Sequence, residues 1–98
     1  MAILSGKVAI VTGASVDIGY ATAKLFAREG ARVVVGARRQ PELNALVAEI
    51  VEAGGSAVAL AGDVKDEAFA KALVELALHQ FGGLDIALLE QKIASEKE

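Results

Sequence analysis

Cysteine is absent from the sequence, and proline, histidine and methionine each occur once among its 98 residues. Without cysteine the chain can form neither disulfide bridges nor thiolate metal sites, and the single His79 has no acid or nucleophile spaced to work with it, so we expect no metal centre. The sequence has no signal-peptide pattern and no run of about 18 apolar residues, which predicts a cytoplasmic protein without a membrane span. A net charge of −3 with no basic stripe argues against nucleic acid and anionic membranes as partners.

Hydrophobic residues are abundant, at 54% of the chain, and they fall into two alternating kinds of segment. Apolar runs that precede or follow glycine predict strands, and apolar residues at helical spacing predict helices. The expected order is strand 7–13, helix 18–29, strand 32–37, helix 41–53, strand 56–61 and helix 66–80. This alternation predicts an α/β fold with right-handed crossovers and a parallel sheet in the strand order 3-2-1.

The last segment of the chain permits two interpretations. Residues 84–89 can add a fourth strand, which extends the order to 3-2-1-4, whereas residues 86–97 are rich in helix formers and Asp85 is suited to cap a helix. We expect a strand followed by a short helix. The expected organisation is one domain over residues 1–89 and a polar helical or disordered tail over residues 90–98, as in an engineered or reduced fragment.

A turn with two glycines, Gly13 and Gly19, joins the first expected strand to the first expected helix. Gly13 suits a turn that requires positive φ, and Gly19 lets the helix pack close to the sheet. A strand that enters a helix through a tight turn directs the first helical N–H groups, and the positive end of the helix dipole, at whatever lies above the strand. The turn therefore predicts a phosphate-binding site.

Thr12, Gly13 and Gly19 match the turn Thr-Gly-x-x-x-Gly-x-Gly, with Asp17 at the position of its middle glycine. In this turn the chain resembles the N-terminal half of the short-chain dehydrogenase/reductase family. Residues 62–64 and 81–86 are similar to family segments as well, so the resemblance covers roughly residues 3–86. It implies a truncated dinucleotide-binding domain, a three-layer Rossmann-like half domain with the strand order 3-2-1(-4).

The resemblance places the pyrophosphate of a dinucleotide at the turn, where the implied binding residues are Gly13, Ser15, Asp17, Ile18 and Gly19. Asp17 departs from the family pattern. As an aspartate before a helix it is suited to cap the first amides, which is worth about 1 kcal/mol. Its charge would also repel a phosphate, at a cost of up to ~4 kcal/mol when the two lie ~4 Å apart. Dinucleotide binding is therefore expected to be weak.

Arg38 and Arg39 follow the second strand, about 20 residues after the glycine turn, where NAD-binding proteins carry an acid that binds the ribose 2′-hydroxyl. Ala37 stands in place of that acid. Because guanidinium groups pair with phosphate through two hydrogen bonds, the resemblance implies NADP as the cofactor and makes NAD the weaker ligand. The alternative is a solvated arginine pair in a loop.

Asp63 and Val64 follow the third strand at its carboxyl end, the side on which open α/β sheets bind ligands. In the family, the corresponding aspartate binds the adenine amino group and the next residue contributes its backbone. The alternative role for Asp63 is to cap the following helix, for which Asp66 is equally suited.

Tyr20 and Lys24 form a literal Tyr-x-x-x-Lys, the spacing of the family's catalytic pair. These two residues lie in the first helix beside the phosphate turn, whereas the family's pair lies in a later helix, so we interpret them as a surface pair. The family's catalytic serine and its Tyr-x-x-x-Lys pair have no counterpart in the sequence. We therefore assign no catalytic residues and expect no enzyme activity.

The third expected helix has apolar residues on two faces. One stripe contains Phe69, Leu73 and Leu76, and the other contains Val74, Leu78 and Phe81. Two apolar faces and an unpaired strand edge near residue 84 predict a homodimer. Two functional hypotheses follow: a non-catalytic fragment that weakly binds the adenosine and pyrophosphate part of NADP, and an engineered or vestigial scaffold with no ligand.

Overall fold

The structure is a computed structural model that describes residues 3–13, 17–63 and 65–88. In chain order the elements are β1 (Val8–Thr12), α1 (Asp17–Arg28), β2 (Arg32–Ala37), α2 (Gln40–Glu52), β3 (Ser56–Ala61), α3 (Glu67–Phe81) and β4 (Ile86–Leu88). Each boundary lies within two residues of the position expected from the sequence. The predicted alternation of strands and helices is confirmed.

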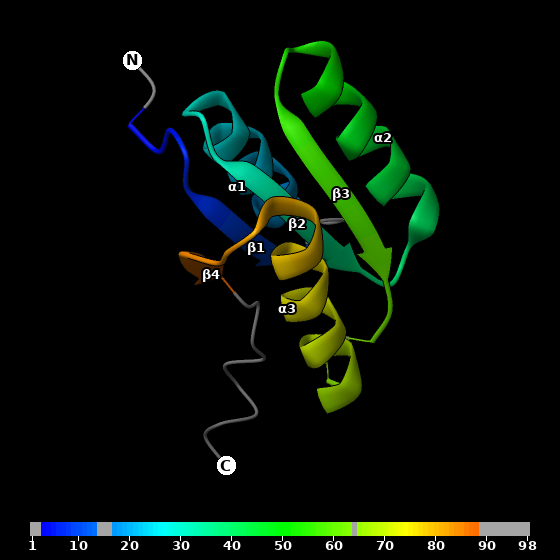
Figure 1. The fold of residues 1–98 in the computed structure, drawn as a ribbon. Coiled ribbons are helices and arrows are strands. Elements are labelled where there is room, and N and C mark those ends of the chain that lie inside the picture. The colour runs from blue at the N-terminus through cyan, green and yellow to red at the C-terminus, as the bar shows by residue number, and fades with distance from the viewer. Residues whose placement is uncertain (1–2, 14–16, 64, 89–98) are drawn as a thin grey trace.

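The four strands form one parallel sheet in the order β3-β2-β1-β4, as predicted (Figure 1). β1 lies between β2 and β4, and its Val8 is in register with Arg32 of β2. Because all pairs are parallel, the carboxyl ends of the strands meet at one edge of the sheet. Each crossover passes through a helix, as parallel strands require.

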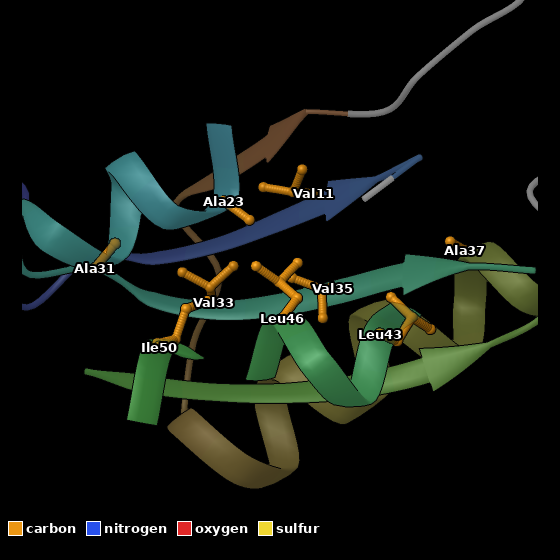
Figure 2. Close-up of a cluster of buried hydrophobic side chains, with 9 residues drawn as sticks. All are labelled: Val11, Ala23, Ala31, Val33, Val35, Ala37, Leu43, Leu46 and Ile50. Carbon is orange, nitrogen blue, oxygen red and sulfur yellow. The ribbon is translucent and has the colours of Figure 1, made fainter. Parts of the chain in front are cut away.

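Two helices cover one face of the sheet and one helix covers the other (Figure 1). Side chains alternate along β1, so Val11 points to the layer of α1 and α2 while Ile10 points to α3. The first core is drawn in Figure 2 and contains Val11, Ala23, Ala31, Val33, Val35, Ala37, Leu43, Leu46 and Ile50. In the second core, Phe69, Leu73 and Ala77 of α3 pack on the strands, whereas Val74 and Leu78 are exposed. The predicted stripe with Phe69, Leu73 and Leu76 packs on the sheet. Of the other predicted stripe, Val74 and Leu78 are exposed, whereas Phe81 packs against the second core.

Gly36 in β2 and Gly62, which directly follows β3, let α3 approach the sheet closely. A Cβ atom at Gly36 would lie 3.1 Å from Leu73 Cδ2 and from Phe69 Cζ. A Cβ atom at Gly62 would collide with the Phe69 ring, 2.6 Å from its Cε1. α3 therefore packs against two positions that carry no side chain, Gly36 and Gly62.

Asp85 takes a different role from the helix cap that its sequence context allowed. Its side chain accepts a hydrogen bond from the Val8 N–H at 2.9 Å, and its own N–H donates to the Val8 carbonyl at 2.9 Å. The residues that follow form β4 and pair with β1. The strand interpretation is therefore confirmed for residues 86–88, and the expected tail over residues 90–98 lies outside the described residues.

Candidate functional site

The carboxyl ends of β1, β2 and β3 bring three predicted site residues to one edge of the sheet. Gly13 follows β1, Arg38 follows β2, and Asp63 lies two residues beyond the end of β3. In open α/β sheets, ligands bind outside the carboxyl ends of the strands. The parallel topology therefore assembles the predicted site from residues that are far apart in the sequence.

The glycine turn begins as the sequence predicts. Gly13 has a φ of 70°, in the left-handed region that glycine adopts without strain. Gly19 is buried in the first turn of α1, which is the position expected for close packing of the helix on the sheet. Ser15 lies outside the described residues, as do the side chains of Asp17 and Ile18. α1 starts at Asp17, so this residue is the first of the helix and not, as predicted, the residue before it. What its side chain binds stays a prediction.

Arg38 and Asp63 contact each other across the ends of β2 and β3. The Arg38 guanidinium Nη2 lies 3.4 Å from Asp63 Oδ1, and the two side chains are 65% and 50% exposed. An ion pair this exposed contributes little to stability, on the order of 0–1 kcal/mol. Both side chains are therefore available to a ligand at small cost.

Asp63 does not cap α3, because Asp66 does so by accepting a hydrogen bond from the Ala68 N–H at 2.9 Å. The Asp63 carboxylate accepts instead from the Lys65 N–H at 2.9 Å. This backbone hydrogen bond, with a further contribution from Arg38, lowers the pKa of Asp63 below its ordinary value. Asp63 is thus a fixed anion at the sheet edge, and its predicted neighbour Val64 lies outside the described residues.

Arg39 lies directly before α2, and its side chain makes no capping hydrogen bond with that helix. Its guanidinium Nη1 is 3.5 Å from Glu42 Oε2 in the first turn. Two residues with exposed guanidinium groups, Arg38 and Arg39, therefore precede α2. The Arg39 side chain does not cap the first amides of this helix. An anion at the start of α2 would meet the positive end of the helix dipole, and the carboxylates of Asp63 and Glu42 lie against the two guanidinium groups.

Tyr20 and Lys24 are joined by a residue that sequence reasoning missed, Glu49 of α2. The Tyr20 hydroxyl donates to Glu49 Oε2 at 2.7 Å, and Lys24 Nζ lies 2.8 Å from Glu49 Oε1. The hydrogen bonds from Lys24 and from Tyr20 lower the pKa of Glu49, and the bond to Glu49 raises the pKa of Tyr20. The surface pair of the sequence prediction is therefore a link between α1 and α2. The signal that could have found it is the predicted strand order 3-2-1 with right-handed crossovers, because this topology places both helices on the same face of the sheet.

The same three side chains border a hollow of about 680 Å³ between α1 and α2. Leu25, Ile50 and Ala53 are among its apolar lining residues. Of the predicted dinucleotide-binding residues that the structure describes with their side chains, namely Gly13, Gly19, Arg38, Arg39 and Asp63, none lines this hollow. It is thus separate from the sheet edge that carries Arg38 and Asp63.

The described part of the chain carries neither a metal centre nor a membrane span. Its His, Asp and Glu side chains form no group of three or more that could hold a metal ion. None of its helices combines the length and the apolar character that a membrane-crossing helix needs.

Comparison with known proteins agrees with this geometry. Residues 7–89 match the family model described as short chain dehydrogenase. An uncharacterized oxidoreductase of Methylorubrum extorquens is 49% identical over 87 residues, which are 88% of this chain and 35% of that protein. A 2,5-dichloro-2,5-cyclohexadiene-1,4-diol dehydrogenase of Sphingobium indicum is 44% identical over 81 residues, which are 83% of this chain and 32% of that protein.

Among solved structures, a hydroxysteroid dehydrogenase of Escherichia coli superimposes with a TM-score of 0.82 at 40% identity. The match covers 86% of this chain and 36% of that one. The chain thus spans about a third of the length of the relatives that it matches. The glycine turn, the sheet order and these matches all lead to one conclusion: the chain belongs to the short chain dehydrogenase family.

Proposed function

We propose that this chain binds the adenosine and pyrophosphate part of NADP weakly and carries out no hydride transfer by itself. The observation that supports the proposal is the convergence of Gly13, Arg38 and Asp63 at the carboxyl edge of the parallel sheet. Positive φ at Gly13 suits a turn whose backbone approaches phosphate, and the pyrophosphate would sit at the start of α1. Catalysis is not proposed, because no catalytic serine or later Tyr-x-x-x-Lys pair is present among the 98 residues.

The preference for NADP over NAD rests on charge. β2 ends at Ala37, so no carboxylate stands at the position that binds the 2′-hydroxyl of NAD. Arg38 and Arg39 follow and are exposed, and a guanidinium group binds phosphate through paired hydrogen bonds. The 2′-phosphate of NADP is the group on this cofactor that would occupy such a place.

Calorimetric titration of the purified chain with NADPH and with NADH, at matched low ionic strength, tests the proposal. We expect saturable heat for both nucleotides and a lower dissociation constant for NADPH. Arg38→Gln should remove most of the difference between them. Arg32→Gln is the matched control, because Arg32 is an exposed arginine at the opposite end of β2.

The alternative is a structural scaffold that binds no ligand, as in an engineered or vestigial fragment. It predicts no heat with either nucleotide from a chain that is folded by circular dichroism. Equal affinity for NADPH and NADH would support dinucleotide binding and contradict the proposed preference for NADP. In a longer protein that contains these residues, we propose the same role, as the cofactor-binding part of an oxidoreductase.

We further propose that two copies of this chain associate through the exposed face of α3. Val74 and Leu78 on this face are 37% and 51% exposed, and exposed apolar patches commonly mark interfaces. Light scattering over a range of concentrations should show a dimer that Leu78→Glu dissociates. Leu25→Glu is the control, since Leu25 is 50% exposed but lies on α1, across the sheet. A monomer mass at every concentration would refute the proposal.

A further inference from the structure

The two arginines of the proposed cofactor site are already paired with acids of the same chain. Arg38 lies 3.4 Å from Asp63, and Arg39 lies 3.5 Å from Glu42. The two acids differ in how they are held. Asp63 is anchored by the backbone N–H of Lys65 at 2.9 Å, so its carboxylate stays at the sheet edge whether or not Arg38 is in contact.

A ligand phosphate that uses the Nη2 group of Arg38 takes this group from Asp63 and then remains close to the Asp63 carboxylate. Both the lost ion pair and the new repulsion weaken the binding of the 2′-phosphate of NADP. The 2′-hydroxyl of NAD is subject to neither, and as a hydrogen-bond donor it suits a carboxylate. Since β2 ends at Ala37 without an acid of its own, Asp63 is the carboxylate that the adjacent strand places beside Arg38.

We infer that Asp63 competes with the cofactor's 2′-phosphate for Arg38 and thereby limits the selectivity of this chain for NADP over NAD. The inference rests on the proposed function, because it concerns the same site. Asp63 is then a specificity-determining residue. The selectivity for NADP over NAD equals the attraction of the 2′-phosphate by Arg38 less its repulsion by Asp63. The effect belongs to exposed charges, so it is expected to be modest and to decrease with salt.

The experiment compares Asp63→Asn with Asp66→Asn by calorimetric titration with NADPH and NADH. The amide introduced by Asp63→Asn retains an oxygen that accepts from the Lys65 N–H, so the loop keeps its local hydrogen bond. Asp66→Asn changes the net charge of the same loop equally, retains the helix cap, and removes no partner of Arg38. Asp63 is also a proposed binding residue, so the readout is the ratio of the two dissociation constants. Asp63→Asn should shift this ratio about fivefold in favour of NADPH, as expected when about 1 kcal/mol of repulsion is removed.

The link to Arg38 is tested by repeating Asp63→Asn in an Arg38→Gln background, where its effect on this ratio should fall below about twofold. Raising the salt concentration should also reduce the gain. An unchanged ratio of the NADPH and NADH dissociation constants in Asp63→Asn would overturn the inference while dinucleotide binding stands. An equal gain in Asp66→Asn would overturn it too, since the gain would then reflect net charge. Absence of heat with both nucleotides in every variant would overturn the proposed function and this inference together.

Discussion

Asp85 and Val8 are joined by two hydrogen bonds. The Val8 N–H donates to Asp85 Oδ2 at 2.9 Å, and the Asp85 N–H donates to the Val8 carbonyl at 2.9 Å. One acidic residue therefore continues the β1–β4 ladder by one position with its backbone and also satisfies a donor on β1 with its side chain. The contact lies directly before Ile86–Leu88, the residues of β4 that the structure describes.

Asp85→Ala should destabilise the fold by about 1–2 kcal/mol, because the Val8 N–H loses its acceptor at a part-buried position. Asp85→Asn keeps a carbonyl oxygen in the same place and should recover most of the loss. Urea unfolding followed by circular dichroism measures both variants. Equal unfolding midpoints for the alanine and asparagine variants would show that the side-chain hydrogen bond does not matter.

Gly62→Ala should be the more harmful of two glycine substitutions in the segments that flank α3. The new methyl group would collide with the Phe69 ring, and displacing a packed aromatic ring costs about 1–3 kcal/mol. Gly83→Ala is the control, because its Cβ would have no atom within 4 Å and its φ is not positive. Thermal unfolding should show a lowered midpoint for the first variant alone, and similar midpoints would contradict the close packing of α3.

Stability should fall on acidification partly because of Glu49. The folded chain lowers the pKa of this carboxyl from its ordinary value of 4.5, through hydrogen bonds from Lys24 and then Tyr20. Ionised Glu49 therefore stabilises the fold above the pKa of the unfolded chain, and this contribution is lost as the pH falls through the lowered folded value.

Glu49→Gln should reduce the slope of stability against pH in this acidic range. Some slope should remain, because the pKa of Asp63 is lowered as well. Glu52→Gln is the control on the same helix, since Glu52 makes no ion pair with the described residues. Denaturant midpoints measured from neutral pH to below the ordinary pKa of glutamate decide the matter, and parallel curves for Glu49→Gln and the parent would contradict the link.

Asp17→Gly should strengthen dinucleotide binding about ten- to a thousandfold, because it removes a negative charge from the predicted phosphate turn. Asp17→Asn separates charge from capping, since asparagine caps a helix as well as aspartate does. Titration with NADPH should therefore show a gain in both variants. The same dissociation constant in the parent and Asp17→Gly would remove Asp17 as the cause of weak binding.

The strands and helices of this fold could be predicted because the local residue patterns and their alternation along the chain indicate the same α/β fold. β2 and β3 occupy the predicted residues. Short apolar runs bounded by turn residues favour strands, and three consecutive valines in β2 strengthen the signal there. The alternation of strands and helices with right-handed crossovers then predicts the order β3-β2-β1, and with it the edge at which Arg38 and Asp63 meet. The place of β4 beside β1 was predicted from the family resemblance.

Contacts between side chains of different elements could not be predicted. Glu49 is 29 residues from Tyr20, and no spacing rule within one helix links them. Asp85 could cap a helix or pair with a strand by its sequence alone, and the deciding factor was the Val8 N–H on a separate strand, 77 residues away. Such choices depend on which unsatisfied polar group is nearby in the folded chain.

β3 lies at the edge of the sheet, and its residues are partly exposed, whereas those of β1 are fully buried. Backbone amides of such an edge strand exchange with solvent hydrogen through local opening that leaves the centre intact. Asp63 is attached to this strand, and Arg38 is attached to the better protected β2. A cofactor bound by both Arg38 and Asp63 would therefore stabilise the pairing of β3 with β2. Its binding should slow the hydrogen exchange of the β3 amides.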